Sequence, residues 1–527
     1  MTFATVVKLG DYLYIDGGQI STFVDNNQTN DAESLEFSKT LAIPLNKSWK
    51  PGSVEIKEIA YKNDMRATNF AGLWADPNRN AIYRWAGELS RSARYEKGEE
   101  TEMYMLSVDG GGDGTWSTKK PAQQAAFDKI IPSTHGQSVF CGDLGFYIGG
   151  YVWAGSSYGE STRGSPGVRM YNASSSEWYN ITDFEPSGPQ GNLRNGAAVC
   201  ILGFGSSPLV MLLGGATDFE SGYQSLSFVT IYDPIAQKWY RQDTVKDTNG
   251  FPSDREYFCA APAQGKNGTV EVYMFGGLSS EKRSLDDLWV LSLPAFKWIQ
   301  LSSTRSSEAI RHMHKCTIAG KRQFISIGGR AKPSKDGFKS DDIWPRGIGI
   351  FDLVTSEWVD SYDPSLGEYD SPASVQKIYK SGEADGYNYT PGVQELFWKN
   401  RSSNDTTEES QSSGGKVSAG TIAGATVGGV AVVVLIAGGI FWLMRRRRQQ
   451  DNQAMPLPTE DFKEPNVWGD QPLPPYRQDI SGAGVPIIEL NSTTVSEMDG
   501  CQSPPNRAEG LAELPTPEIG SFRSPSM

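Results

Sequence analysis

The stretch from Val270 to Trp298 decides the fold of this chain. It begins with VEVYMFGG (270–277), continues through a polar loop, and ends with LWVLSLPAFKW (288–298). An alternating apolar run that ends in paired glycines, followed by a second apolar run that turns back at a tryptophan, is typical of antiparallel strands. The stretch therefore predicts two paired strands and the start of a third.

This pattern recurs along the chain. Six apolar runs end in paired or near-paired glycines, and a tryptophan follows each run at intervals of 67, 62, 61, 59 and 60 residues, by subtraction of the tryptophan numbers. The pairs are Gly17-Gly18, Ala86-Gly87, Gly149-Gly150, Gly214-Gly215, Gly276-Gly277 and Gly328-Gly329. The tryptophans are Trp49, Trp116, Trp178, Trp239, Trp298 and Trp358. A near-constant period of this length indicates one supersecondary unit that is repeated six times.

Each repeat contains four predicted strands. A further apolar run precedes the glycine pair, as in 196–202 (GAAVCIL) and 315–319 (KCTIA), and Tyr232-Asp and Phe351-Asp mark a turn before the tryptophan. Four-stranded sheets repeated about an axis bury their faces against neighbouring sheets, and large aromatic side chains fill the space between them. We therefore predict an all-β fold.

These features resemble the kelch repeat, with its glycine pair, Tyr-Asp turn and tryptophan. The resemblance covers about residues 3–365 and implies a six-bladed β-propeller in residues 1–365. The second repeat departs from the pattern at Ala86-Gly87 and by an insertion, DGGGDG (109–114), and the first repeat lacks the Tyr-Asp turn. Because the first repeat begins almost at Met1, its innermost strand is the one we expect to be incomplete.

The composition suits a globular, turn-rich body. The 527 residues include 57 glycines and 14 tryptophans, with 38% hydrophobic and 11% aromatic residues. A net charge of −13 argues against a nucleic-acid partner, because the chain has no general positive field to attract phosphates. Five cysteines are too few for a disulfide scaffold.

An uncharged apolar segment at residues 419–444 predicts a transmembrane helix, since a span needs about 20 residues. Arg445 to Arg448 follow it, whereas Lys416 alone lies nearby on the other side. The positive-inside rule therefore places the propeller outside the cell, in all probability at the plasma membrane, and the tail in the cytoplasm. Eight glycosylation sequons that precede the segment support this sidedness: Asn27, Asn46, Asn172, Asn180, Asn267, Asn388, Asn400 and Asn404.

The first ten residues, MTFATVVKLG, lack the features of a signal peptide. Because a large folded domain does not cross a membrane without such a signal, we expect the true N-terminus to lie upstream of Met1. The alternative interpretation is an intracellular propeller.

The remaining segments differ in composition. Residues 366–398 carry apolar side chains for packing against the propeller, residues 399–418 form a flexible stalk, and residues 445–527 form a disordered tail. Three glycines four residues apart share one face of the span and would permit a homodimer, although the helix could equally stay monomeric. They are Gly420, Gly424 and Gly428.

The tail contains one candidate recognition motif. Leu473, Pro474, Pro475 and Tyr476 resemble the LPxY variant that WW domains bind. The resemblance implies a WW-type ubiquitin ligase as a partner, and the alternative is an ordinary proline-rich tail.

Four arginines lie just before predicted innermost strands: Arg66, Arg194, Arg255 and Arg311. By resemblance to kelch folds they should surround one mouth of the central channel, where converging guanidinium groups would bind carboxylates of a ligand. The alternative, which we favour, is that each arginine pairs with an acidic neighbour such as Glu256 and stabilises its blade.

The sequence offers little for metal or cofactor chemistry. His312 and His314, two apart on a strand, point to one face and could ligate a metal. A copper oxidase like galactose oxidase would need two histidines, two tyrosines and a cysteine crosslinked to a tyrosine, and this chain has only three histidines. We therefore expect no metal site, no cofactor and no catalytic residues.

Four cysteines fall in the first strand of repeats three to six: Cys141, Cys200, Cys259 and Cys316. Their recurrence favours buried thiols that pack near the axis. Bridges between adjacent blades are the alternative, because the expected compartment is oxidising.

Together these features predict a cell-surface recognition module, resembling membrane-anchored kelch proteins of filamentous fungi. Its ligand would be a protein or a wall polysaccharide. The alternative function is an enzyme with its active site in the channel mouth, either oxidase-like or sugar-modifying.

Overall fold

The structure is a computed structural model that describes residues 1–398, except residues 22, 25–26, 29–34, 90–101, 154–160, 183–192, 205–207, 218–221, 267, 302–308, 332–341 and 383–387. The chain separates into two units, Met1–Gly414 and Gly415–Met527, and every described residue belongs to the first. The predicted stalk, transmembrane helix and tail therefore lie outside the described residues.

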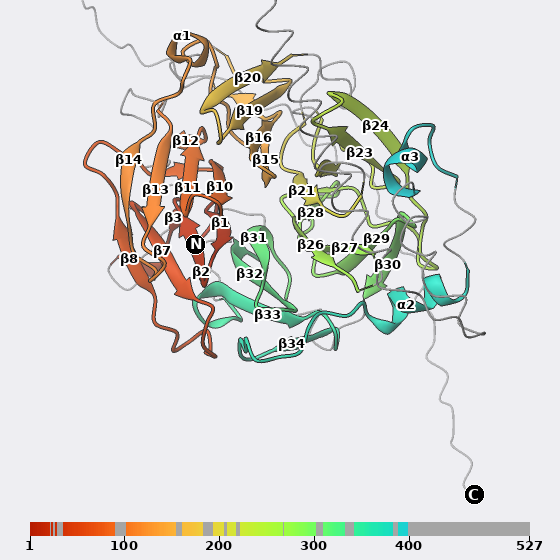
Figure 1. The fold of residues 1–527 in the computed structure, drawn as a ribbon. Helices are drawn as coiled ribbons and strands as arrows, with labels where there is room; N and C mark the ends of the chain where they lie inside the picture. Colours follow the sequence, from red (N-terminus) through yellow and green to blue (C-terminus); the bar gives the residue numbers. More distant parts are fainter. Residues whose placement is uncertain are drawn as a thin grey trace, which may run out of the picture. The chain divides into compact units, whose positions relative to one another are not determined.

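Six four-stranded antiparallel sheets, the blades, form the first unit (Figure 1). Each blade takes its strands in chain order from the centre outward. The first three are β1 (Thr5–Leu9), β2 (Tyr12–Asp16), β7 (Lys39–Pro44), β8 (Lys57–Ala60); β10 (Gly72–Asp76), β11 (Ala81–Trp85), β13 (Tyr104–Val108), β14 (Gly114–Thr118); and β15 (Gln137–Cys141), β16 (Leu144–Ile148), β19 (Val168–Asn172), β20 (Glu177–Ile181).

The last three blades are β21 (Ala197–Ile201), β22 (Leu209–Leu213), β23 (Phe228–Asp233), β24 (Lys238–Asp243); β26 (Cys259–Gln264), β27 (Val270–Phe275), β29 (Leu288–Leu293), β30 (Lys297–Leu301); and β31 (His312–Ala319), β32 (Gln323–Arg330), β33 (Ile348–Asp352), β34 (Glu357–Val359). The stretch that opened the sequence analysis is thus most of the fifth blade.

Short elements lie between the blade strands. Five two-stranded ribbons pair β3 (Gln19–Ile20) with β6 (Leu35–Glu36), β4 (Phe23–Val24) with β5 (Asn27–Gln28), β9 (Thr68–Asn69) with β12 (Glu88–Leu89), β17 (Tyr151–Val152) with β18 (Arg163–Gly164), and β25 (Arg255–Glu256) with β28 (Leu278–Ser279). The described helices are α1 (Gln124–Phe127), the 3-10 turn η5 (Pro345–Gly347), α2 (Ala373–Lys380) and α3 (Val393–Trp398).

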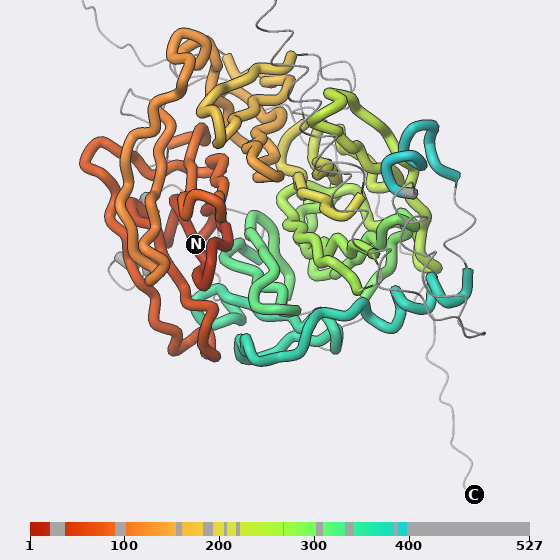
Figure 2. The backbone as a smooth tube through the Cα atoms, in the orientation of Figure 1, coloured from red at the N-terminus to blue at the C-terminus, as the bar shows by residue number. Residues whose placement is uncertain are grey.

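The six blades close into a ring. The innermost strands contact one another in order, from β1 to β10, β15, β21, β26 and β31, and β31 contacts β1. Figure 2 shows the first blade, in red, beside the last, in green. This arrangement confirms the predicted six-bladed propeller.

The contact that closes the ring lies between Trp49 of the first blade and Tyr362, which follows β34. The Trp49 N–H donates to the Tyr362 carbonyl at 3.1 Å, and the Tyr362 N–H donates to the Trp49 carbonyl at 2.9 Å. Their rings stack with centroids 5.0 Å apart. The strand β1 pairs with β2 over all five of its residues, so the expectation of an incomplete innermost strand is wrong.

The repeated tryptophans pack between blades, as the sequence predicts. The Trp298 indole is buried and donates from Nε1 to the Leu226 carbonyl of the preceding blade at 2.9 Å. In the second blade, Trp116 donates in the same way to Thr40 Oγ1 at 3.0 Å. Each tryptophan therefore combines burial of a large apolar ring with a hydrogen bond across the inter-blade contact.

The glycine pairs also join neighbouring blades. The second glycine of each pair has φ between 83° and 106°, and its N–H donates to a carbonyl of a neighbouring entering segment at 2.8–3.1 Å. The six bonds are Gly18 to Thr68, Gly87 to Ser133, Gly150 to Leu193, Gly215 to Arg255, Gly277 to Arg311 and Gly329 to Met1. Because the last of these closes the ring, all six inter-blade contacts follow one rule.

Replacing Gly150 by alanine should show the steric part of this rule. Gly150 has φ +85°, and an added Cβ would lie 2.3 Å from the Thr134 carbonyl oxygen. Gly110 has a similar φ of +78° but nothing within 4 Å, so Gly110→Ala is the matched control. Gly150→Ala should lower the free energy of unfolding by about 1–3 kcal/mol more than the control. Chemical denaturation followed by tryptophan fluorescence measures this difference, and equal losses would contradict it.

Residues 366–398, the extension, lie along the outer side of blades four to six (Figure 1). Val375 and Ile378 of α2 are buried in the core of the last two blades. Val393 and Phe397 of α3 are buried in the core of blades four and five, and the Phe397 ring lies 5.0 Å from the Phe296 ring. The extension therefore adds apolar core to the second half of the ring.

One polar cluster anchors the extension. Tyr369 Oη donates to Glu271 Oε2 at 3.0 Å and lies 2.9 Å from Tyr273 Oη. All three side chains are buried. Burial raises the pKa of Glu271 above its ordinary value, although hydrogen bonds from Thr269, Tyr369 and Ser371 oppose the shift.

This pKa shift predicts a pH dependence of stability. Above the ordinary value of 4.5, the folded chain holds the Glu271 proton more tightly than the unfolded chain, so stability falls as pH rises toward the raised value. Glu271→Gln should therefore be about 1 kcal/mol more stable than the parent at pH 7, and the difference should shrink below pH 4.5. Denaturation at both pH values tests this, with the exposed Glu58→Gln as control. A parent chain that is more stable at pH 7 would contradict the prediction.

Candidate functional site

The two ends of the propeller differ in the length of their connections. The loop face carries the links from second to third strands, which run from 12 residues (276–287) to 22 residues (17–38). The turn face carries the links from first to second strands, which run from two residues (Gly10–Asp11) to seven (202–208). Because long connections carry most of the variable surface of such a fold, the loop face is the candidate site.

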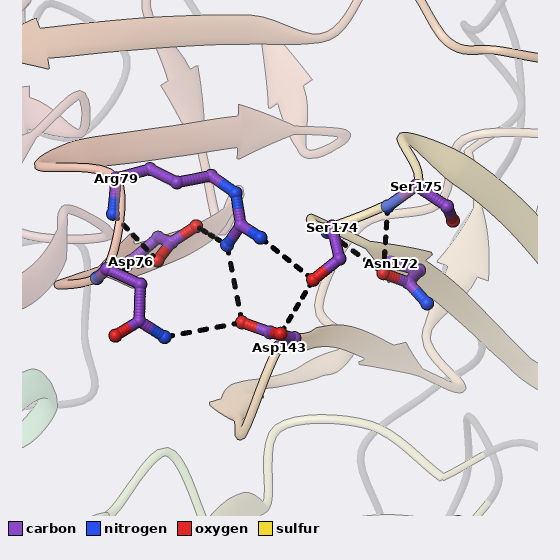
Figure 3. A network of polar contacts seen from close by, with 7 residues as sticks. Asp76, Arg79, Asp143, Asn172, Ser174 and Ser175 are labelled. Atoms are coloured by element: carbon purple, nitrogen blue, oxygen red, sulfur yellow. Dashed lines mark hydrogen bonds and ion pairs between the residues drawn. The ribbon is translucent and has the colours of Figure 1, made fainter. Parts of the chain in front are cut away.

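The turn face is occupied by contacts within the propeller (Figure 3). Arg79 Nη1 lies 2.7 Å from Asp76 Oδ2 and 3.2 Å from Asp143 Oδ1 of the next blade. Ser174 Oγ accepts from Arg79 Nη2 at 2.8 Å and donates to Asp143 Oδ2 at 2.6 Å. Hydrogen bonds from Ser174 and Arg79 lower the pKa of Asp143, so this network joins blades two and three as an ion pair.

At the loop face, six residues share a left-handed backbone with φ between 57° and 64°. Each lies two positions before the residue that pairs with the end of the second strand, and we call them the mouth ring: Phe3, Phe70, His135, Asn195, Tyr257 and Met313. Backbone N–H groups join the blades here, from Phe70 to the Phe3 carbonyl at 3.1 Å and from Tyr257 to the Asn195 carbonyl at 2.7 Å. A strained conformation repeated in six blades persists because these bonds hold it.

The side chains of the mouth ring fill the loop-face end of the channel. The Phe70 ring lies 3.7 Å from His135, 5.0 Å from Phe3 and 6.1 Å from Tyr257. Burial raises the pKa of Tyr257, with Glu256 adding to the shift, so its hydroxyl remains protonated. Behind the ring lies a central cavity of about 360 Å³ that the innermost strands line.

Glu256 organises the loop face beside this ring. It lies 3.8 Å from Arg194 Nη1 and 3.3 Å from Lys282 Nζ, and it accepts a hydrogen bond from Asn195 Nδ2 at 2.9 Å. Lys282 Nζ also donates to Tyr223 Oη at 2.6 Å. The Lys282 side chain is 58% exposed, so this cluster presents a cation and a phenol ring to solvent.

Two of the four predicted arginines serve the blades. Arg255 is fully buried and pairs with Asp287, while Arg311 is 3% exposed and pairs with Asp342 at 3.0 Å. Arg311 also donates to the Gly328 carbonyl at 2.7 Å. The interpretation in which an acidic neighbour fixes each arginine therefore describes both, although Arg255 uses Asp287 instead of the adjacent Glu256.

The other two arginines keep some exposed surface. Arg194 lies beside Glu256 at the loop face, 14% exposed. Arg66 is half-buried, and its carbonyl accepts a hydrogen bond from Arg84 Nη2 at 2.5 Å. The structure thus brings Arg194 into the loop-face cluster and places Arg66 three residues earlier in its entering segment than Arg194 is in its own.

Sequence reasoning missed Arg84, which lies within β11. Its side chain is 2% exposed, pairs with Asp16 of the first blade at 3.3 Å and lies over the Tyr61 ring at 5.0 Å. The signal was an arginine inside an otherwise apolar strand, where burial requires a partner. The mouth ring was also missed, because its members share a backbone conformation and no side-chain type.

Comparison with known proteins agrees with this architecture. Residues 138–384 match the KLHDC2/KLHL20/DRC7 kelch-repeats domain. The chain is a kelch-repeat propeller. It is 25% identical over 425 residues to a kelch repeat-containing protein of Arthroderma benhamiae, and the match covers 72% of this chain. The chain spans 59% of that relative's length.

A second match lies beyond the propeller. Residues 422–455 match the epidermal growth factor receptor transmembrane-juxtamembrane segment. These residues overlap the predicted span at 419–444 and lie outside the described ones. Within the described part of the chain, no helix is both long enough and apolar enough to cross a bilayer.

The cysteines of the kelch propeller correct the expectation of buried thiols. Cys141 bridges to Cys200, and Cys259 bridges to Cys316, so one disulfide joins blades three and four and the other joins blades five and six. Successive residues of a strand face opposite neighbours. In each bridge the two cysteines are offset by one position along equivalent strands, and this offset turns them toward each other.

The two histidines of β31 are used inside the blade. His312 Nε2 accepts from Arg330 Nε at 3.1 Å, so its Nδ1–H donates to Ser284 Oγ at 2.8 Å. Burial and Arg330 lower the pKa of His312 to about 3. His314 packs against the Phe275 ring at 5.2 Å. Among the described residues, no group of three or more His, Cys, Asp or Glu side chains could hold a metal.

The predicted glycosylation sites differ in their surroundings. Asn46, Asn180 and Asn388 are exposed. Asn172 Oδ1 accepts the Ser174 and Ser175 N–H groups in a turn (Figure 3). The side chains of Asn27 and Asn267, together with Asn400, Asn404 and the tail motif Leu473–Tyr476, lie outside the described part.

Proposed function

We propose that this kelch-repeat protein is a cell-surface recognition module that binds a protein or polysaccharide ligand through its loop face. The observation that carries this proposal is the contrast between the two faces. Long connections, the mouth ring and the Glu256 cluster gather on one face, whereas the turn face has short links and internal ion pairs. Kelch propellers are generally protein-interaction modules, and the loop face supplies the exposed side chains for that role.

An extracellular location is supported by the two inter-blade disulfides. Such bridges persist in oxidising compartments and are rare in the cytosol. The match to a transmembrane-juxtamembrane segment at residues 422–455 supports a single span, followed by a cytoplasmic tail. A WW-type ligase bound at Leu473–Tyr476, and a homodimer through the span, belong to the same proposal.

Lys282, Tyr223 and Arg194 are the proposed contact points for the ligand. A phenol ring beside a cation suits both sugar faces and acidic peptides. Arg66 is proposed as a further contact, because it is half-buried and precedes the second blade at the same face. Arg255 and Arg311 support the face from within, through their ion pairs.

The test uses the full chain in detergent, on arrays of cell-wall polysaccharides and of peptides. The double variant Arg194→Ala, Lys282→Ala should lower binding at least about tenfold. Lys238→Ala is the control, because Lys238 is exposed at the turn face. Equal losses in both variants, or stoichiometric copper or iron in the purified chain, would contradict a binding-only role.

A further inference from the structure

The central cavity has its own chemistry, separate from the loop face. Its walls are the innermost strands of all six blades. Each of these strands is hydrogen-bonded in its sheet on one side only. The free edges therefore present backbone N–H and C=O groups toward the cavity, and such groups need partners.

The charge in this cavity is positive. Lys315 lines it, and Lys8 lines it near the turn face, where its side chain is exposed. No aspartate or glutamate is among the described residues that line the cavity, although the chain as a whole has 62 acidic and 49 basic residues. The cavity thus has the opposite sign to the protein.

Lys315 is an ammonium group without a counter-ion. No described residue forms an ion pair or a hydrogen bond with its side chain. The side chain is half-buried, and the cavity is the space that it lines. Burial lowers the pKa of Lys315, which is the expected consequence of enclosing a charge with no partner.

We propose that the central cavity binds a small oxyanion, with Lys315 Nζ as its charge partner and strand-edge N–H groups as further donors. The volume of about 360 Å³ admits a phosphate, a sulfate or a small carboxylate, and lies at the lower end for small-molecule pockets. The mouth ring fills the loop-face end, so the anion enters from the turn face past Lys8. This site does not depend on the recognition role proposed for the loop face.

The test is calorimetric titration of the full chain in detergent, at low chloride, with inorganic phosphate and separately with acetate. We expect one site per chain, and Lys315→Met should weaken it at least about tenfold, since a charge-assisted bond is lost. Lys315→Arg keeps the charge and should retain binding, and Lys238→Met is the surface control. Binding of phosphate alone or of acetate alone identifies the class of anion.

A second measurement needs no variant. Glyoxylate condenses with the free amine of a lysine, water leaves, and cyanoborohydride delivers hydride to the imine carbon, which leaves a carboxymethyl group. Peptide mapping should find this group on Lys315, and phosphate or acetate should protect against it. Unchanged affinity in Lys315→Met, no binding of either anion in the millimolar range, or no protection would overturn the proposal.

Discussion

Replacing Arg255 by methionine should lower the free energy of unfolding by about 3–5 kcal/mol, because the change leaves a buried carboxylate without its partner. The Arg255 guanidinium is fully buried and donates to Asp287 Oδ1 at 2.5 Å and to Asp287 Oδ2 at 2.8 Å. It also donates to the Ser253 carbonyl at 2.8 Å and the Gly276 carbonyl at 3.0 Å. One side chain thus joins an entering segment, a glycine pair and the loop before β29.

The pKa of Asp287 shows that the pair is an ionic one. Burial alone would raise this pKa, but Arg255 lowers it below its ordinary value. Stability from the pair is therefore present above that ordinary value and is lost as pH falls through the lowered one. Arg283→Met is the control, because Arg283 is 72% exposed beside Glu281 and should change stability by less than about 0.5 kcal/mol. Chemical denaturation measures both variants, and similar losses would show that the Arg255 pair is dispensable.

Removing the bridge between blades three and four should cost about 4 kcal/mol of unfolding free energy. The double variant Cys141→Ala, Cys200→Ala removes it without leaving a free thiol. The bridge closes a segment with a sequence separation of 59 residues, and its loss restores conformational freedom to the unfolded chain.

The second bridge provides an internal comparison. Cys259 and Cys316 are 57 residues apart, so their double alanine variant should lose a similar amount. Mass spectrometry after alkylation without reductant should find all four cysteines protected. Alkylation of Cys141 or Cys200 in the native chain, or a loss below about 1 kcal/mol, would contradict the assignment.

Much of the fold could be predicted from a few residue types. Gly276-Gly277 and Trp298 recur because each does one geometric task in every blade, namely a left-handed turn against a neighbour and a ring between two sheets. Such positions tolerate few alternatives, so the repeat is visible in a single sequence. The count of six blades followed directly from the spacing.

The candidate site was harder to predict, because its geometry depends on the backbone and on partners distant in the chain. Phe70 and Asn195 occupy equivalent places in the mouth ring and have nothing in common but φ. Arg255 selects Asp287, 32 residues away, over its neighbour Glu256. The bridging of Cys141 to Cys200 depended on an offset of one residue between two strands, which is evident only when the strand register is known.

The extension determines how the propeller carries mechanical tension. Load applied beyond Phe397 acts first on Phe397 and Val393, which are buried against blades four and five. It reaches Tyr362 only after α3 and α2 have peeled away, and Tyr362 forms the hydrogen-bonded contact with Trp49 that closes the ring. A pull on the chain from the C-terminal side is therefore absorbed along the outer surface before it can open the circle of blades.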